Sequence, residues 1–341
     1  MIKRTIEISR EPAHLAVRHK QLLLKRNGEV VGSIPCEDLG MVVVDHPQTT
    51  YTHAALAALA ESDAALVVCG HDHLPVAVLL PLSDHSQVVW RINDQIAAKK
   101  PLHKRLWKQL IQAKIRAQAG NLAVDSPARK KLLAFAAAVR SGDPTNREAQ
   151  AARLYWSNWL IHPDVEVSDR QFRRAREGMA PNALLNYGYA VVRAAIARSL
   201  VSSGLLPSLG IKHVHRANAF CLADDLIEPL RPLVDHRVRE LYWEGRSELD
   251  QPTKAALLEL LTTPVFTNNR QGPLLVALHT LTASLAKCYD GTAKELQIPI
   301  SKPEFRSSRP EADSTADRVS GRDPNGEASA PCKSADIAAC G

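Results

Sequence analysis

The sequence predicts an α+β protein, in which a β-rich, sandwich-like N-terminal domain precedes a larger all-helical domain. Short runs of aliphatic and β-branched residues fill residues 1–90. Apolar residues then recur with the period of about 3.6 that marks amphipathic helices over residues 91–305. Residues 306–341 are small and polar without a period. Such a segment cannot bury enough apolar surface to fold, so we expect a disordered tail.

The strand-like runs of the N-terminal domain follow one another closely. Asn27-Gly28 separates two of them by the length and residue types of a tight hairpin. Residues 52–62, THAALAALAES, have a helical pattern instead. We therefore expect a β-rich domain with one helix. The runs predicted as strands are TIEIS, HLAVR, QLLLKR, EVVGSIP, GMVVVD, AALVVCG and PVAVLLPL.

Amphipathic segments replace the strands beyond residue 90, where strand signals nearly vanish. This pattern predicts that the second domain is helical. The segments are KRLWKQLIQAKIRAQ, RKKLLAFAAAV, REAQAARLYW, NALLNYGYAVVRAAIARSL, LADDLIEPL and QGPLLVALHTLTASLAK.

The composition is that of a soluble globular protein, with 45% hydrophobic and 23% charged residues among 341. The formal net charge of +7 suits an anionic partner such as nucleic acid. The six cysteines include no C-x-x-C pair, which argues against a zinc ribbon and favours reduced thiols. We find no signal peptide and no apolar run of the ~18 residues that a membrane helix needs, so we expect a cytoplasmic protein.

A carboxylate stands on the apolar stripe of REAQAARLYW, residues 147–156. On a helix, Glu148 shares the face of Ala152, Tyr155 and Trp159, which is normally buried. One explanation is a capping box, in which Thr145 and Glu148 satisfy the first helical donors. The other explanation is that Glu148 binds a cation inside the protein.

Two histidines follow the Gly- and Pro-containing segment SSGLLPSLG. In GIKHVHR, residues 210–216, an extended backbone would point His213 and His215 the same way. Such a pair can bind a metal ion. Surface or hydrogen-bonding histidines are the alternative interpretation.

Three acids gather on one side of LADDLIEPLRP, residues 222–232. Asp224, Asp225 and Glu228 are spaced as neighbours on a helix, where like charges repel and a bound cation would reverse the effect. Pro229 removes the hydrogen bond to the carbonyl of Asp225 and loosens the helix beside the acids. A solvated acidic face is the alternative.

Carboxylates with one imidazole form an oxygen-rich ligand set, which suits Mg²⁺ or Mn²⁺ better than zinc. Such ions most often serve phosphate chemistry. Two basic stretches would bind the phosphate backbone of a nucleic acid. Their basic residues are Lys99, Lys100, Lys104, Arg105, Lys108, Lys114 and Arg116, then Arg170, Arg173, Arg174 and Arg176.

Three segments also resemble a known family. EAQAARLYW, PNALLNYGYAVVRAAIARSLVSSGLLPSLGIKH and FCLADDLIEPLRPLVD, in this order, are similar to the CRISPR-associated integrases of spacer acquisition, the first-numbered Cas family, and most closely to its type II branch. The resemblance covers roughly residues 1–300. It implies an N-terminal domain that dimerises and a helical domain that is the catalytic one.

The resemblance implies that Glu148, His213 and Glu228 are the catalytic residues and the metal ligands. It gives Asp225 a supporting place beside them. The spacing to Glu228 favours His213 over His215. Lys212, next to His213, and Ala149, where glycine is common, depart from the family pattern.

The implied function is that of a metal-dependent DNA integrase and endonuclease. It would insert short double-stranded DNA fragments into a repeat array, with a fragment's 3′-hydroxyl attacking a repeat phosphodiester. The implied partners are double-stranded DNA and the other chains of a heterohexamer, in which homodimers of this chain assemble around a dimer of the second, small CRISPR-associated adaptation protein. The type II effector and a ring-forming DNA-end protein are further partners that the resemblance suggests.

Two other functions stay open from the residues alone. One is a stand-alone metal nuclease that cleaves branched DNA repair intermediates. The other is a DNA-binding scaffold without chemistry, whose acids are only a solvated face.

Overall fold

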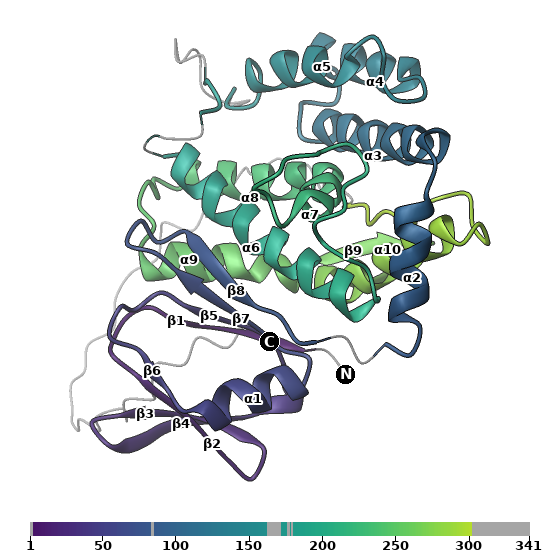
Figure 1. Ribbon diagram of the computed structural model, residues 1–341. Helices are drawn as coiled ribbons and strands as arrows, with labels where there is room; N and C mark the ends of the chain where they lie inside the picture. The colour runs from purple at the N-terminus through teal and green to yellow at the C-terminus, as the bar shows by residue number, and fades with distance from the viewer. Residues whose placement is uncertain (1–2, 83–84, 162–171, 176–177, 179, 302–341) are drawn as a thin grey trace, which may run out of the picture.

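The computed structural model describes residues 3–82, 85–161, 172–175, 178 and 180–301 (Figure 1). Strands occupy the N-terminal part and helices most of the remainder, so the predicted α+β fold class is confirmed. The predicted tail, residues 306–341, lies outside the described residues. Among the helices of the described ranges, none is long and apolar enough to cross a membrane.

Two four-stranded sheets form the N-terminal domain. In the first sheet the order is β1-β5-β7-β8, and only the β7–β8 pair is antiparallel. In the second sheet the order is β4-β3-β2-β6. The strands are β1 (Arg4–Ile8), β2 (His14–Arg18), β3 (Gln21–Arg26), β4 (Glu29–Pro35), β5 (Leu39–Val44), β6 (Thr50–Tyr51), β7 (Ala65–Cys69) and β8 (Pro75–Leu79).

The hairpin between β3 and β4 forms where the sequence predicted it. Asn27 and Gly28 have φ angles of 50° and 85°, and Arg26 pairs with Glu29 across the turn. A two-residue turn of this kind needs positive φ at both positions, which asparagine and glycine adopt at little cost.

Strand β5 is buried on both faces. Val42 and Val44 point into a core shared by the two sheets and helix α1 (His53–Glu61), whereas Met41 and Val43 point into the core of the helical half. Side chains alternate along a strand, so one continuous apolar run supplies both cores. The first sheet is therefore covered by the second sheet on one face and by helices on the other.

The helical half surrounds the long helix α6 (Figure 1). Gly188 of α6 faces α8 so closely that an added Cβ would lie 2.5 Å from Val234 Cγ1. The helices are α2 (Val88–Ala97), α3 (Lys100–Gly120), α4 (Pro127–Ala138), α5 (Arg147–Trp156), α6 (Asn182–Ser202), α7 (Cys221–Leu226), α8 (Arg231–Trp243), α9 (Gln251–Leu258) and α10 (Leu274–Tyr289), with 3-10 turns η2 (Glu228–Leu230) and η3 (Glu259–Leu261). A further 3-10 turn, η1 (Cys36–Asp38), joins β4 to β5 in the N-terminal domain.

The helical half also contains a short hairpin that the sequence patterns did not predict. It consists of β9 (Pro264–Thr267) and β10 (Arg270–Pro273). Asn268 and Asn269 form its turn with φ angles of 50° and 63°. An Asn-Asn pair between two short runs is the signal that could have revealed it.

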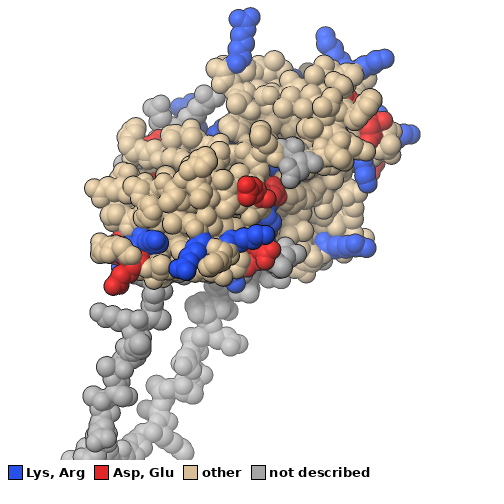
Figure 2. Space-filling view, turned by 60° about the horizontal axis from the view of Figure 1, so that its bottom comes forward, with Lys and Arg blue, Asp and Glu red and all other residues tan. Residues whose placement is uncertain are grey.

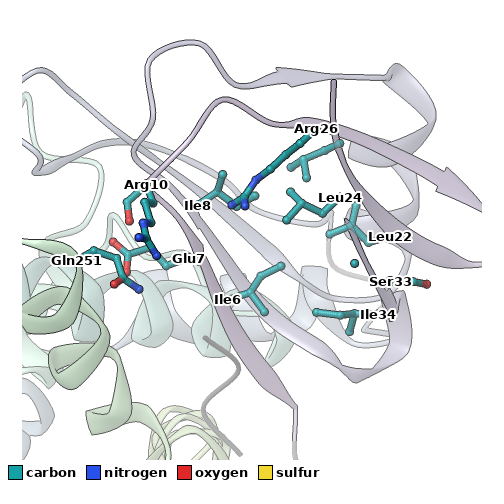
Figure 3. A pocket seen from close by; sticks show the side chains of 13 residues that line it. Ile6, Glu7, Ile8, Arg10, Leu22, Leu24, Arg26, Ser33, Ile34 and Gln251 are labelled. Atoms are coloured by element: carbon teal, nitrogen blue, oxygen red, sulfur yellow. The ribbon is translucent and has the colours of Figure 1, made fainter. Parts of the chain in front are cut away.

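A cavity of about 330 Å³ lies in the N-terminal domain (Figure 3). Apolar side chains of β1, β3 and β4 line it, with Glu7, Arg10 and Gln251 at one end. Burial raises the pKa of Glu7 to about 7. None of the predicted site residues lines this cavity.

Candidate active site

The Glu148 side chain does not cap the N-terminus of helix α5. The N-cap is Asn146, whose side chain accepts a hydrogen bond from Ala149 N–H. The Asp143 carboxylate accepts from the N–H groups of Arg147 (2.9 Å) and Glu148 (3.0 Å). These residues satisfy the first helical donors, so the alternative explanation of Glu148, a capping box with Thr145, is wrong.

The Glu148 carboxylate instead contacts a lysine of helix α3. Lys114 Nζ lies 2.7 Å from Glu148 Oε1 and 2.5 Å from Glu228 Oε2. Its side chain is only 11% exposed. Burial opposes the charge of Lys114, but the two carboxylates outweigh it and raise its pKa. Two acids far apart in the sequence thus converge on one buried cation.

Glu228 is held by a second cation as well. It opens the 3-10 turn η2, where Pro229 interrupts the helical hydrogen bonding that began in α7. Arg231 Nε lies 2.9 Å from Glu228 Oε1. Burial opposes ionisation of Glu228, but Lys114 and Arg231 prevail and lower its pKa to about 2. Glu228 is therefore ionised at neutral pH, and as a buried side chain it is no part of a solvated face.

Asp225 holds the loop that carries His213. Its carboxylate is fully buried. Oδ2 accepts from the N–H groups of Ile211 (2.5 Å) and Lys212 (2.9 Å), and Oδ1 accepts from His213 N–H (3.2 Å) and lies 2.7 Å from His213 Nδ1. Gly210 is required at the start of the loop, because an added Cβ would lie 2.2 Å from the His213 carbonyl oxygen.

This arrangement sets the state of the His213 ring. The hydrogen bond to Asp225 raises the pKa of His213, and the nearby charges of Glu228 and Asp224 act in the same direction. Since Asp225 occupies Nδ1, Nε2 is the nitrogen left to bind a ligand. His213 also stands edge-on to Trp107 of α3, with ring centroids 5.8 Å apart. His215 is placed differently, since its Nδ1 accepts from Ala217 N–H within the same loop.

The structure thus brings Glu148 and Glu228 together at Lys114, and it places His213 near enough to Glu228 for that charge to raise the pKa of His213. Within the described ranges, no three His, Cys, Asp or Glu side chains stand close enough to form a metal-binding group by themselves. The donor chemistry nevertheless fits a hard divalent ion, because two carboxylates already share one cation and Asp225 orients a third donor.

Sequence reasoning missed two cations of this site. Lys114 was grouped with the basic residues that would contact nucleic acid, and that interpretation is wrong because its side chain is buried between the acids. The signal was present in the helical period, since Lys114 shares a stripe with Leu110, Ile111 and Gln118, which are also buried. Arg231 could have been suggested by its i+3 spacing from Glu228.

The other predicted basic residues are distributed as follows. Arg174 is half-buried, donating to the side chains of Asn182 and Asn186. Arg170 and Arg176 lie outside the described residues. Lys108 is half-buried, and those that are exposed are Lys99, Lys100, Lys104, Arg105, Arg116 and Arg173. On the face seen in Figure 2, Lys and Arg lie at separate places among other residues and form no continuous patch of described residues.

We compared the chain with family models, with the sequences of known proteins and with solved structures. The family model described as CRISPR associated protein Cas1 matches residues 6–256. The CRISPR-associated endonuclease Cas1 of Neisseria meningitidis serogroup C is 37% identical over 290 residues, which cover 84% of this chain and 92% of that protein.

Two solved structures share the fold. A casposase bound to integration product superimposes with a TM-score of 0.69 at 19% identity, covering 91% of this chain and 96% of that one. A chain of a Cas6-RT-Cas1–Cas2 complex gives 0.66 at 17% identity, covering 88% of this chain and 36% of that one. The fold class is that of the endonuclease- and integrase-like proteins of CRISPR systems. The chain belongs to the Cas1 family. Its membership of the type II branch stays a prediction.

Proposed function

We propose that this protein is a metal-dependent DNA integrase and endonuclease of CRISPR adaptation. The observation that carries the proposal is the convergence of Glu148 and Glu228 on one buried cationic nitrogen, from elements far apart in the chain. A solvated acidic face would not gather its carboxylates inside the protein. The similarity to a Cas1 endonuclease and to a casposase supports the same activity.

Glu148, His213 and Glu228 would hold Mg²⁺ or Mn²⁺. Such an ion, when bound, neutralises the phosphodiester and stabilises charge on the oxygen that leaves. The chain's own residues prepare this site. Asp225 fixes the His213 ring so that Nε2 is free, and Arg231 keeps one oxygen of Glu228 in place.

The exposed basic residues at the start of α3 would hold the DNA backbone. Lys100, Lys104 and Arg105 are exposed on the helix that also carries Lys114 into the site. One helix could therefore bind phosphate groups at its exposed start and reach the acids through Lys114, which would bring DNA to the helix that contacts the proposed metal ligands. We propose double-stranded DNA as the substrate on this ground.

We further propose that the protein acts as a homodimer with a dimer of the small second adaptation protein. The fold similarity to a chain of a Cas1–Cas2 complex supports this partner. The cytoplasmic location also stays a prediction.

The test is strand transfer of a short DNA duplex into a supercoiled plasmid that carries a repeat, with the small partner present. Glu148→Ala should abolish the product, whereas Glu244→Ala, at the exposed glutamate that follows α8, should act like the wild type. Full activity of Glu148→Ala would refute the proposed mechanism. Cleavage of branched DNA without any dependence on the partner would instead favour a stand-alone nuclease.

A further inference from the structure

Lys114 occupies the position in which two proposed metal ligands meet. Its ammonium lies within hydrogen-bonding distance of both Glu148 and Glu228, and its side chain is 11% exposed. The three residues come from different elements, α3, α5 and η2. Lys114 therefore does what a bound cation would do, because it neutralises the acids and ties the elements together.

Each oxygen of Glu228 lies beside a cation in this arrangement. Oε1 pairs with Arg231 Nε at 2.9 Å, and Oε2 pairs with Lys114 Nζ at 2.5 Å. Mg²⁺ binds carboxylate oxygens at about 2.0–2.1 Å, closer than an ammonium does. An ion that bound Glu148 and Glu228 together would therefore stand where the ammonium stands, and two cations there repel each other.

We propose that Lys114 is the resident cation of the metal-free site and that a divalent ion must displace its ammonium group from Glu148 and Glu228. This inference rests on the proposed function, because it concerns the same two ligands. Lysine suits the role, since its compact charge sits on a flexible four-carbon stem that can swing away, whereas Arg231 can keep its own oxygen. Lys114 is thus a positioning residue that sets how tightly metal binds.

The role has a physical reason. Two carboxylates buried together without a cation would repel each other and lack the solvation that they have in water. Lys114 keeps them charged, close and aimed at one point before metal arrives. The same ion pairs must break when metal binds, so Lys114 lowers the affinity for metal while it holds the two carboxylates in position.

The first experiment measures Mn²⁺ binding to the full-length protein by calorimetry. Lys114→Met retains the apolar stem and removes the ammonium. Lys130→Met changes an exposed lysine of α4 and serves as the matched control. Lys114→Met should bind Mn²⁺ at least about tenfold more tightly than the wild type, because no internal cation competes. Its thermal midpoint should also rise more on Mn²⁺ addition, and Lys130→Met should match the wild type in both measurements.

The second experiment needs no variant at site 114. Reductive methylation of the wild-type protein, analysed by mass spectrometry, reports how accessible each lysine is. Lys114 should be protected without metal and label several-fold faster with saturating Mn²⁺, while Lys130 should label equally in both conditions. A lysine with a merely structural role would stay protected throughout.

The outcomes separate this inference from the proposed function. Unchanged or weaker Mn²⁺ binding by Lys114→Met would overturn the role of Lys114 and leave the metal site standing. If that variant does not fold, unchanged labelling of Lys114 overturns the inference instead. If Mn²⁺ binds neither the wild type nor Lys114→Met, the proposed metal site and the inference both fall.

Discussion

Replacing Asp225 by asparagine tests how the loop of His213 is held. The aspartate side chain is fully buried. Its two oxygens each serve two nitrogen groups, Ile211 N–H and Lys212 N–H on one side and His213 N–H and Nδ1 on the other. Asparagine has the same shape but only one acceptor oxygen, so its amide nitrogen must face one of these pairs.

The cost follows from that geometry. In the better orientation the amide oxygen keeps Ile211 and Lys212, and the amide nitrogen faces His213, whose N–H then loses its acceptor. A buried donor without a partner costs about 1–3 kcal/mol, and bonds to a charged group exceed neutral ones by roughly 1 kcal/mol. We expect Asp225→Asn to lower the free energy of unfolding by about 3 kcal/mol.

The substitution should also change the His213 ring. An amide that donates to Nδ1 favours the tautomer with the proton on Nε2, which removes the lone pair needed for metal. Mn²⁺ affinity should therefore fall by roughly 10–100-fold, as expected when a residue that orients a ligand is lost.

Urea denaturation and Mn²⁺ calorimetry measure the two effects. The control is Asp224→Asn, because Asp224 is the adjacent acid but is partly exposed, accepting from Asn218 Nδ2 at 2.6 Å. It should cost less than about 1 kcal/mol. An equally small loss for Asp225→Asn, with unchanged metal affinity, would refute the account of the loop.

Three further results are expected. The pKa of Glu228 is about 2 in the folded protein and 4.5 ordinarily, so on acidification the unfolded chain binds a proton first. The free energy of unfolding should therefore fall from about pH 5 towards pH 2, and Glu228→Gln should reduce this pH dependence in urea titrations. Identical pH dependences in the two proteins would contradict the ion pairs of Glu228. The raised pKa of His213 means that Mn²⁺ affinity should decline on acidification with a midpoint above the ordinary 6.5, and a midpoint below 6.5 would disprove the role of Asp225. Gly210→Ala places a Cβ 2.2 Å from the His213 carbonyl oxygen and should cost about 1–3 kcal/mol by thermal or urea unfolding. Gly272→Ala, where φ is not positive and an added Cβ meets no atom within 4 Å beyond its chain neighbours, should cost much less; equal costs would show that the loop has room.

The sequence by itself determined seven strands of the N-terminal domain and the longest helices. The Asn27-Gly28 turn, the alternating residues of β5 and the helical period of α3 and α6 are local patterns, and hydrogen bonding and burial act on them within a few residues. Local periodicity also showed that Glu148 faces inward. Similarity of three segments to one family then suggested which acids and which histidine belong together.

The tertiary structure alone decided what those acids meet. Lys114 lies 34 positions before Glu148 in the chain and was indistinguishable, by type, from its exposed neighbours on α3. The sequence does not distinguish Asp225 from the other acids of its helix, whereas in the structure the loop that begins at Gly210 packs over the Asp225 carboxylate. The packing of the helices against one another decides which charged residues pair. The energy of an ion pair depends on the distance between the charges and on how far water is excluded around them, and the spacing of residues along one helix predicts neither.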